Sequence, residues 1–204
     1  MKKRVIAAFD FDCTITDRDT FLPFMRFVVG TPTFVLKLIK LSPVFIKHIT
    51  GNVPRTVVKK EVIKEFLAGK KANEINSLAK EYSQTFAKLL RQEAKDRIKW
   101  HKSQGHVVIL VSASLEHYLE PWANSNGFDY VFGTKLEIDN EGKLTGALKG
   151  SNCYGPEKVN RILEVYPNKD ELIVYAYGDS KGDKELLEFA HHSYLRTWPN
   201  DENL

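Results

Sequence analysis

The sequence contains little cysteine and no long uncharged apolar run. Cys13 and Cys153 are the only two cysteines among 204 residues, which excludes a disulfide framework, and they lack the spacing of a zinc site. No stretch approaches the roughly 20 uncharged apolar residues that a membrane-spanning helix needs. Internal repeats and low-complexity segments are also missing. What remains is a globular composition, 43% hydrophobic and 27% charged, long enough for one core and a smaller appended unit.

The charge balance is mildly basic. The formal net charge is +4, with a pI of about 8.9, which favours anionic substrates or surfaces but is too weak to indicate nucleic acid as a partner. The basic start Met1–Arg4 is followed by only five apolar residues before Asp10, too few for a signal peptide. We therefore expect a cytoplasmic protein.

Two carboxylates follow the first apolar run. The segment Val5–Phe9 has the composition of a buried strand and is followed by Asp10, Phe11 and Asp12. Side chains alternate along a strand, so both carboxylates would point the same way while the backbone stays extended. Burying two like charges is costly unless a cation or strong donors compensate. The pattern therefore predicts a divalent-metal or phosphate-chemistry site at the end of this strand.

Three further polar features follow in order. The apolar run Val107–Val111 leads into Ser112 and Ser114, Lys158 comes next, and the run Leu172–Tyr177 leads into Gly178-Asp179-Ser180 and Asp183. Each has an alternative interpretation. Asp12 could form an N-cap or Asx-turn, Ser112 could cap a helix beginning near Leu115, and Asp179-Ser180 could cap the helix around 184–190. Lys158 taken singly could be a solvated helix residue.

Taken together, the four features resemble the four motifs of the haloacid dehalogenase (HAD) superfamily, subclass IB, which contains phosphoserine phosphatase. The resemblance implies an α/β fold with a Rossmann-like parallel-sheet core and an inserted all-helical type-one cap. It places the core at residues 1–15 and 94–204 and the cap at 16–93. It also implies a phosphatase, a phosphoric monoester hydrolase acting through an aspartyl-phosphate.

The resemblance also implies a role for each motif residue. Asp10 would be the nucleophile and Asp12 the general acid and then base. Mg²⁺ would be held by Asp10, Asp179 and the backbone carbonyl of Asp12, with Asp183 orienting these ligands. Phosphate-binding groups are expected in a separate set, namely Ser112, the backbone N–H groups of the following turn beginning at Ala113, and Lys158.

Helical periodicity dominates between the first two strands. Val57, Val62, Ile63, Phe66 and Leu67 are expected near one helical face, and Ala72–Lys102 is expected to form one long helix. Later segments predict a β-hairpin from Tyr130–Ile138 and Leu144–Leu148, a helix over Glu157–Tyr166 and a final strand over His192–Thr197.

The substrate is less well defined, because this chain departs from the phosphoserine phosphatase pattern. Asp19 stands where that enzyme has glutamate, Ala113-Ser114 replaces paired glycines, and Gly178–Asp183 replaces a Gly-Asp-Gly-Ala-Asn-Asp motif. Asp19 and Arg55 are candidate specificity residues. The leading expectation is a small-molecule phosphate ester. The alternatives are a lipid phosphate headgroup such as phosphatidylglycerophosphate, and transfer of the phosphoryl group to an acceptor alcohol.

The segment Phe21–Ile49 makes the lipid alternative specific. It is rich in Phe, Val, Leu and Ile, and Lys37, Lys40, Lys47 and His48 fall within an arc of roughly 100°. That pattern fits a basic amphipathic element in contact with an anionic membrane at its inner face. The interpretation favoured from the sequence is a cap whose apolar faces pack on each other and on the core. Gly30–Pro32 and Pro43 should break the segment into short helices.

Overall fold

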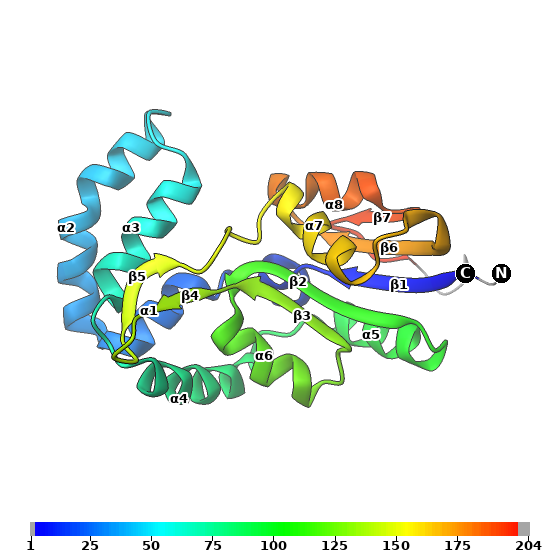
Figure 1. The fold of residues 1–204 in the computed structure, drawn as a ribbon, viewed down its shortest axis with the longest axis horizontal. Helices are drawn as coiled ribbons and strands as arrows, with labels where there is room; N and C mark the ends of the chain where they lie inside the picture. Colours follow the sequence, from blue (N-terminus) through cyan, green and yellow to red (C-terminus); the bar gives the residue numbers. More distant parts are fainter. Residues whose placement is uncertain (1–2, 200–204) are drawn as a thin grey trace.

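The computed structural model describes residues 3–199 and is built around one parallel sheet. Its strands are arranged in the order β3-β2-β1-β6-β7 (Figure 1). They are β1 (Arg4–Phe9), β2 (Val107–Leu115), β3 (Tyr130–Thr134), β6 (Leu172–Gly178) and β7 (His192–Leu195). Phe9 at the end of β1 is in register with Leu110 of β2 and Tyr177 of β6. The three apolar runs seen in the sequence are therefore the three central strands.

Four helices cover the two faces of the sheet. They are α5 (Gln92–Ser103), α6 (Glu116–Ser125), α7 (Pro156–Val165) and α8 (Lys184–Phe189). Ala7 and Phe9 belong to a core shared with α5 and α6, whereas Ile6 and Ala8 belong to a core shared with α7 and α8. Figure 1 shows these two pairs of helices on opposite sides of the strands. Burial on both faces explains why β1 is apolar without alternation.

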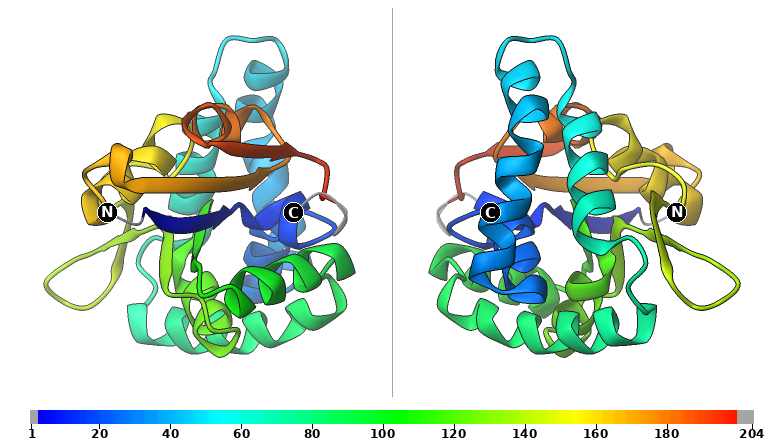
Figure 2. Two further views of the ribbon diagram at one scale, coloured as in Figure 1. Left: turned by 90° about the vertical axis from the view of Figure 1, so that its right-hand side faces the viewer. Right: turned by 90° about the vertical axis from the view of Figure 1, so that its left-hand side faces the viewer.

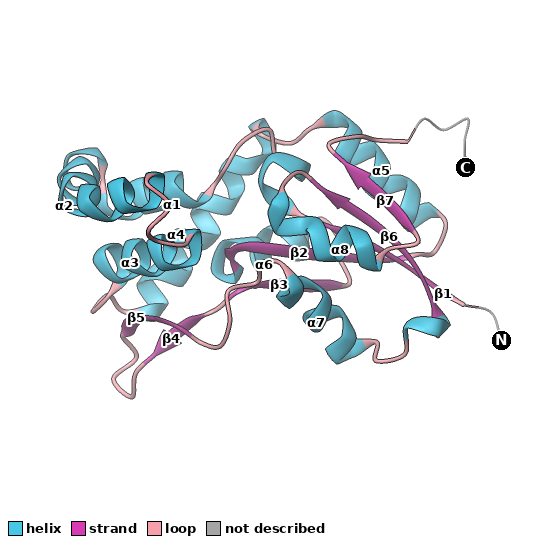
Figure 3. Cartoon of the chain, turned by 90° about the horizontal axis from the view of Figure 1, so that it is seen from above, coloured by secondary structure: helices cyan, strands magenta, loops and turns pink. Residues whose placement is uncertain are grey.

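A helical insertion between β1 and α5 lies at one end of the molecule (Figures 1 and 3). It contains α1 (Phe21–Val29), α2 (Thr31–Ile49), α3 (Arg55–Leu67) and α4 (Ala72–Ser83). Its apolar side chains, including Ile63 and Phe66, join the core cluster that contains Phe9. The α/β fold with a helical insertion after the first strand, expected from the sequence, is confirmed.

The single helix expected over Ala72–Lys102 is wrong. The chain forms α4, then a 3₁₀ turn at Gln84–Lys88, and starts α5 only at Gln92. Between them it returns from the insertion to the sheet, where the backbone N–H of Asp17 donates to Leu89 O at 2.8 Å and that of Arg91 donates to Ile15 O at 2.9 Å. These pairings take the backbone groups that a continuous helix would use internally.

The expected β-hairpin forms over a shorter range. Leu136–Ile138 (β4) pairs with Leu144–Leu148 (β5), whereas Tyr130–Thr134 is β3 of the main sheet. The hairpin joins the insertion rather than the sheet, because Gly69 N–H donates to Leu144 O and Leu144 N–H donates to Lys70 O, both at 2.8 Å.

Two expectations within the insertion also need correction. Gly30 separates α1 from α2 as expected, but α2 continues through Pro43, which is exposed. On α3, Val57 is exposed and Val58 takes the buried position beside Val62 and Phe66. The helix over 157–166 and the strand over 192–197 are confirmed to within two residues at each end.

Residues 1–2 and 200–204, which complete the expected core, lie outside the described residues. Of the helices that the structure describes, none combines the length and apolar character needed to cross a bilayer.

Candidate active site

A cavity of about 540 Å³ lies between the ends of β1, β2 and β6 and the first three helices of the insertion. Strand β1 is central, with β2 and β3 on one side of it and β6 and β7 on the other. The strand order therefore reverses at β1, and open α/β sheets bind ligands at the carboxyl ends of the strands at such a point. All of the residues singled out in the sequence line it: Asp10, Asp12, Asp19, Arg55, Ser112, Ala113, Lys158, Asp179 and Asp183. The fold thus brings together residues that are up to 173 positions apart.

Asp10 lies at the centre of the cavity wall. Its backbone N–H still donates to Tyr177 O at 2.9 Å, which fixes it at the end of β1. Its Oδ1 accepts a hydrogen bond from Lys158 Nζ at 2.6 Å, and both side chains are buried. Burial raises the pKa of Asp10 to about 7. The charge of Lys158 lowers this pKa by a smaller amount, and the Asp183 carboxylate raises it further.

Lys158 is held between two carboxylates. It lies in the first turn of α7, behind Gly155 at φ 62°, and its Nζ donates to Asp10 and, at 2.5 Å, to Asp183 Oδ1. Burial alone would lower the pKa of Lys158, but the two carboxylates outweigh it and raise the pKa above its usual value. Lys158 is therefore a buried permanent cation and not the solvated helix residue of the alternative interpretation.

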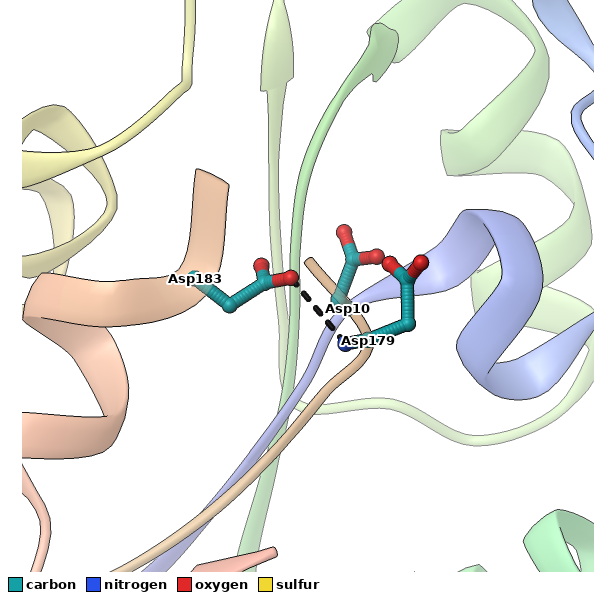
Figure 4. A group of neighbouring side chains, drawn as sticks. All are labelled: Asp10, Asp179 and Asp183. Atoms are coloured by element: carbon teal, nitrogen blue, oxygen red, sulfur yellow. Dashed lines mark hydrogen bonds between the residues drawn. The ribbon is translucent and has the colours of Figure 1, made fainter. Parts of the chain in front are cut away.

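Asp179 and Asp183 complete an acidic group with Asp10 (Figure 4). One carboxylate oxygen from each of the three lies within 4.8 Å of the others. Asp183 Oδ2 accepts hydrogen bonds from the backbone N–H of Asp179 at 3.1 Å and of Ser180 at 3.0 Å. Burial, with Asp183 next, raises the pKa of Asp179. Asp183 thus fixes the turn that carries Asp179.

The acidic group fits a hard divalent cation. Its ligand atoms are oxygens, the type that Mg²⁺ and Ca²⁺ prefer. Three carboxylates face one lysine here, and although burial is the main cause of the raised pKa values of Asp10 and Asp179, the Asp183 carboxylate adds to both. A bound cation would remove the surplus of negative charge, so the residues present suit a metal.

Asp12 has a separate set of partners. Its Oδ1 accepts hydrogen bonds from the N–H of Thr20 at 2.8 Å and from the Thr20 hydroxyl at 2.6 Å, and its Oδ2 accepts one from the Ser114 hydroxyl. These partners lie 8 and 102 residues away, so the side chain forms neither an N-cap nor an Asx-turn. Burial, followed by the charge of Asp19, raises the pKa of Asp12 to about 6. The pKa of Asp12 is thus closer to neutral pH than that of an ordinary aspartate.

Ser112 and Ala113 are part of β2. Ser112 is buried and its hydroxyl accepts from the N–H of Ser114 at 3.2 Å, while α6 begins after Leu115 without a side-chain cap. The capping role considered for Ser112 is therefore wrong. The helix over 184–189 has no side-chain cap either, and Ser180 instead forms a capping box with Asp183 at the short turn Lys181–Asp183 that precedes it.

Asp19 and Arg55 lie on the side of the cavity that the insertion forms. Asp19 precedes α1, and its Oδ1 accepts hydrogen bonds from the N–H of Phe21 at 2.9 Å and of Leu22 at 3.4 Å. Arg55 is exposed at the first position of α3. Asp19 thus has a structural role at a helix start, whereas Arg55 presents its charge to the cavity.

Several polar residues that line the cavity were missed in the sequence, among them Lys59 and Asn152. Lys59 Nζ donates to the carbonyl of Ala113, to Asn152 Oδ1 at 2.6 Å and to Thr134 Oγ1 at 3.2 Å. Burial lowers the pKa of Lys59 to about 8. A signal existed for Lys59, since it lies one helical turn after Arg55. None existed for Asn152, which is in an irregular segment.

Gly182 explains one departure from the phosphoserine phosphatase motif, which has asparagine at this place. A Cβ at position 182 would lie 2.5 Å from the ring of Tyr154. The tyrosine therefore occupies the space that a larger side chain would need.

Comparisons with known proteins agree with this geometry. The family model for haloacid dehalogenase-like hydrolases matches residues 7–188. Protein CicA of Caulobacter vibrioides is 33% identical over 193 residues, which cover 94% of this chain and 86% of that protein. The phosphoserine phosphatase of Methanocaldococcus jannaschii is 26% identical over 197 residues, covering 93% of this chain and 83% of the enzyme.

Solved structures share the fold. A protein of unknown function from Bordetella pertussis aligns with a TM-score of 0.81 at 21% identity, covering 95% of this chain and 90% of that one. A phospho-aspartyl intermediate analogue of phosphoserine phosphatase aligns with a TM-score of 0.62 at 20% identity, covering 96% and 87%. The chain belongs to the haloacid dehalogenase-like hydrolase family and is similar to its phosphoserine phosphatases.

Proposed function

We propose that this chain hydrolyses phosphomonoesters through an aspartyl-phosphate on Asp10. The observation that carries the proposal is the pairing of the buried Asp10 carboxylate with Lys158 inside a cavity at the switch point of the sheet. Phosphoryl transfer depends mostly on positioning and charge neutralisation. A carboxylate nucleophile divides the hydrolysis into two easier steps.

In the first step, a carboxylate oxygen of Asp10 bonds to phosphorus while the bond from phosphorus to the ester oxygen breaks. Asp12 gives its proton to the leaving oxygen, so an alcohol departs. The raised pKa of Asp12, about 6, supports this role, because a general acid works best with a pKa near the working pH.

In the second step, Asp12 takes a proton from water as the water oxygen bonds to phosphorus. The bond between phosphorus and Asp10 breaks, which releases inorganic phosphate and restores the carboxylate. The bonds from Thr20 and Ser114 hold Asp12 in place for both transfers.

The phosphoryl oxygens would be held by Ser112, by the N–H of Ala113 and by Lys158. Asp10, Asp179 and the backbone carbonyl of Asp12 would hold Mg²⁺, with Asp183 orienting the loop of Asp179. When bound, Mg²⁺ would supply positive charge between the carboxylates and the anionic phosphate.

We assign the core to residues 1–15 and 94–204 and the cap to 16–93, and we place substrate selection in the cap. For a small-molecule ester, Arg55 would contact an acidic group of the substrate, and Asp19 would shape the pocket through its bonds at the start of α1. The names of the phosphoserine phosphatase relatives make phosphoserine the first ester to examine.

A second candidate substrate is a lipid phosphate headgroup. Beside its charged residues, the cap side of the cavity has an apolar wall that consists of Phe21, Leu22, Pro23, Phe45, Val58 and Val62. An apolar wall beside a phosphate site suits an ester that carries hydrocarbon.

The test is phosphate release from a panel of phosphoserine, sugar phosphates, nucleotides and short-chain lipid phosphates, with Mg²⁺ and no added alcohol. We expect turnover of at least one ester and none with Asp10→Asn, which keeps the shape but is a poor nucleophile. Turnover that survives this substitution would disprove the mechanism. Turnover that needs an added alcohol would show a phosphotransferase instead.

A further inference from the structure

The outer surface of the α2–α3 hairpin, residues 31–67, is unusually apolar. The structure has nine exposed large apolar side chains among the residues it describes, and six of them are in this hairpin: Val35, Leu36, Ile39, Ile46, Ile49 and Val57. Exposed apolar residues scattered singly are normal, but a contiguous group marks an interaction surface.

Four of these residues form a single row along α2, here named the outer stripe. Val35, Ile39, Ile46 and Ile49 fall within an arc of about 80° at 100° per residue. Their exposed fractions are 48%, 64%, 61% and 83%. The opposite side of the helix is used for packing, since Leu41 is buried and the ring of Phe34 lies 5.6 Å from that of Phe66. The outer stripe therefore has no partner within the described chain.

The helix that carries the outer stripe lies at the edge of the molecule. Figure 2 (right) shows α2 in front when the molecule is seen from the cap end, and Figures 1 and 3 place it at the extreme edge. Because the four side chains of the stripe are also exposed, the stripe is accessible at this end of the molecule.

The same hairpin holds the positive charge of the molecule. Residues 31–67 contain seven Lys or Arg residues and two Glu residues, a formal charge of +5, whereas the whole chain carries +4. The rest of the sequence therefore has a formal charge of −1. Lys40 and Lys47 are exposed on the polar side of α2, about 140° and 120° from the middle of the outer stripe at 100° per residue. Lys40 also pairs with Glu65 at 2.7 Å, whereas Lys47 has no ion pair in the described structure.

An exposed apolar row, with an exposed lysine on the polar side of the same outward helix, fits one kind of partner. Helices that lie in a membrane interface bury an apolar row at the boundary of the headgroups and acyl chains while cations contact anionic lipids. A protein partner would need an apolar groove with matching acidic residues. An anionic bilayer supplies an apolar layer and negative charge over its whole surface.

We propose that the outer stripe of α2 docks on the surface of an anionic lipid bilayer. Ile39 and Ile46 enter the headgroup boundary, and Lys47 contacts lipid phosphates. Phe45 of the same helix lines the catalytic cavity, so docking places that cavity next to the lipid surface. Docking is independent of the catalytic mechanism.

The experiment is flotation with vesicles of phosphatidylcholine alone or of phosphatidylcholine and phosphatidylglycerol at 3:1. The protein should float with the anionic vesicles and not with the neutral ones, and 0.5 M NaCl should weaken binding because salt screens the lysines. Ile39→Gln with Ile46→Gln should weaken binding at least tenfold, because two apolar anchors are lost. Lys47→Gln should weaken it about fivefold, as one cation near the surface contributes about 1 kcal/mol.

Matched controls are Val165→Gln on α7 and Lys184→Gln on α8, which are exposed residues outside the hairpin. Both should bind vesicles like the wild type. Circular dichroism and hydrolysis of p-nitrophenyl phosphate should be unchanged in all four variants.

The proposal would be overturned if the wild type did not float with anionic vesicles, or if the Ile39/Ile46 variant floated as well as the wild type. It would also be overturned if the wild type did not bind vesicles but formed a dimer in sedimentation velocity, and the Ile39/Ile46 variant were a monomer. The last would identify the stripe as a contact between two copies. Asp10→Asn should float normally, so failure of docking and failure of the catalytic mechanism are distinguishable.

Discussion

The ammonium nitrogen of Lys158 lies 2.6 Å from Oδ1 of Asp10, and both side chains are buried. The same nitrogen lies 2.5 Å from Oδ1 of Asp183. One cation therefore pairs with two carboxylates at buried positions. Because isolated buried charges are costly, this contact supports the fold as well as the proposed chemistry.

Lys158→Met should lower both activity and stability. It leaves the carboxylates of Asp10 and Asp183 without their cation, and breaking a buried ion pair in this way costs about 3 kcal/mol. We expect a loss of that size in urea unfolding at pH 7 and no measurable phosphate release. Lys184→Met on the exposed surface of α8 is the control. Unchanged stability would show that the buried charges are balanced in another way.

Removal of divalent metal should stop turnover. EDTA should abolish phosphate release and Mg²⁺ should restore it, because the anionic ester must approach three carboxylates. Mg²⁺ should also raise the melting temperature of the wild type, since a ligand that binds only the folded state stabilises it. The same addition should leave Asp179→Asn almost unchanged. A similar rise in that variant would place the metal elsewhere.

Lys59 should make stability rise at alkaline pH. Its pKa in the folded state is about 8, below the usual 10.5 of an unfolded lysine. Between these values the unfolded chain binds more protons, so the free energy of unfolding increases with pH. The wild type should gain about 2 kcal/mol relative to Lys59→Met from pH 7 to pH 10, a figure reduced for the part of the side chain that water reaches. Urea unfolding measures it, with Lys60→Met as control, and parallel pH profiles would contradict it.

His101 should make the protein sensitive to acid. The side chain is fully buried, between Tyr177 OH at 2.9 Å and His106 Nδ1 at 2.8 Å, and burial, then Arg97, lowers its pKa to about 3. Below pH 6.5 the imidazole of His101 is protonated in the unfolded chain but stays neutral in the folded state. The free energy of unfolding therefore falls as pH decreases. From pH 6.5 to pH 5 the wild type should lose about 2 kcal/mol more than His101→Gln. Equal losses in urea unfolding would show that His101 is protonated in the folded protein.

The sequence patterns located the central strands and the residues at their ends. Each of β1, β2 and β6 is a short apolar run, and a polar residue follows each run, so Asp10, Ser112 and Asp179 could be placed without a structure. Lys158 could be placed only through its order among the other motifs, because a single lysine in a helix carries no local signal.

Contacts between distant segments could not be predicted in this way. Nothing between Gln84 and Arg91 breaks a helix in the sequence, yet the chain turns there because Leu89 pairs with Asp17. The bond from Lys59 to Asn152 likewise joins residues 93 positions apart. Periodicity describes how one segment buries its own face, and it contains no information on which distant backbone or side chain completes a hydrogen bond.

The β4–β5 hairpin has a mechanical consequence for the cap. It leaves the core beside Lys135 and returns at Lys149, whose N–H donates to Lys135 O at 3.0 Å, and in between it is bonded to the chain around Gly69 and Lys70. The chain passes between the core and the cap at two places, near Thr16 and near Leu90. The two-stranded hairpin is a third connection between them. A truncation that excises residues 17–89 alone would leave the hairpin with an unmatched edge, so a minimal catalytic module would have to shorten both segments together.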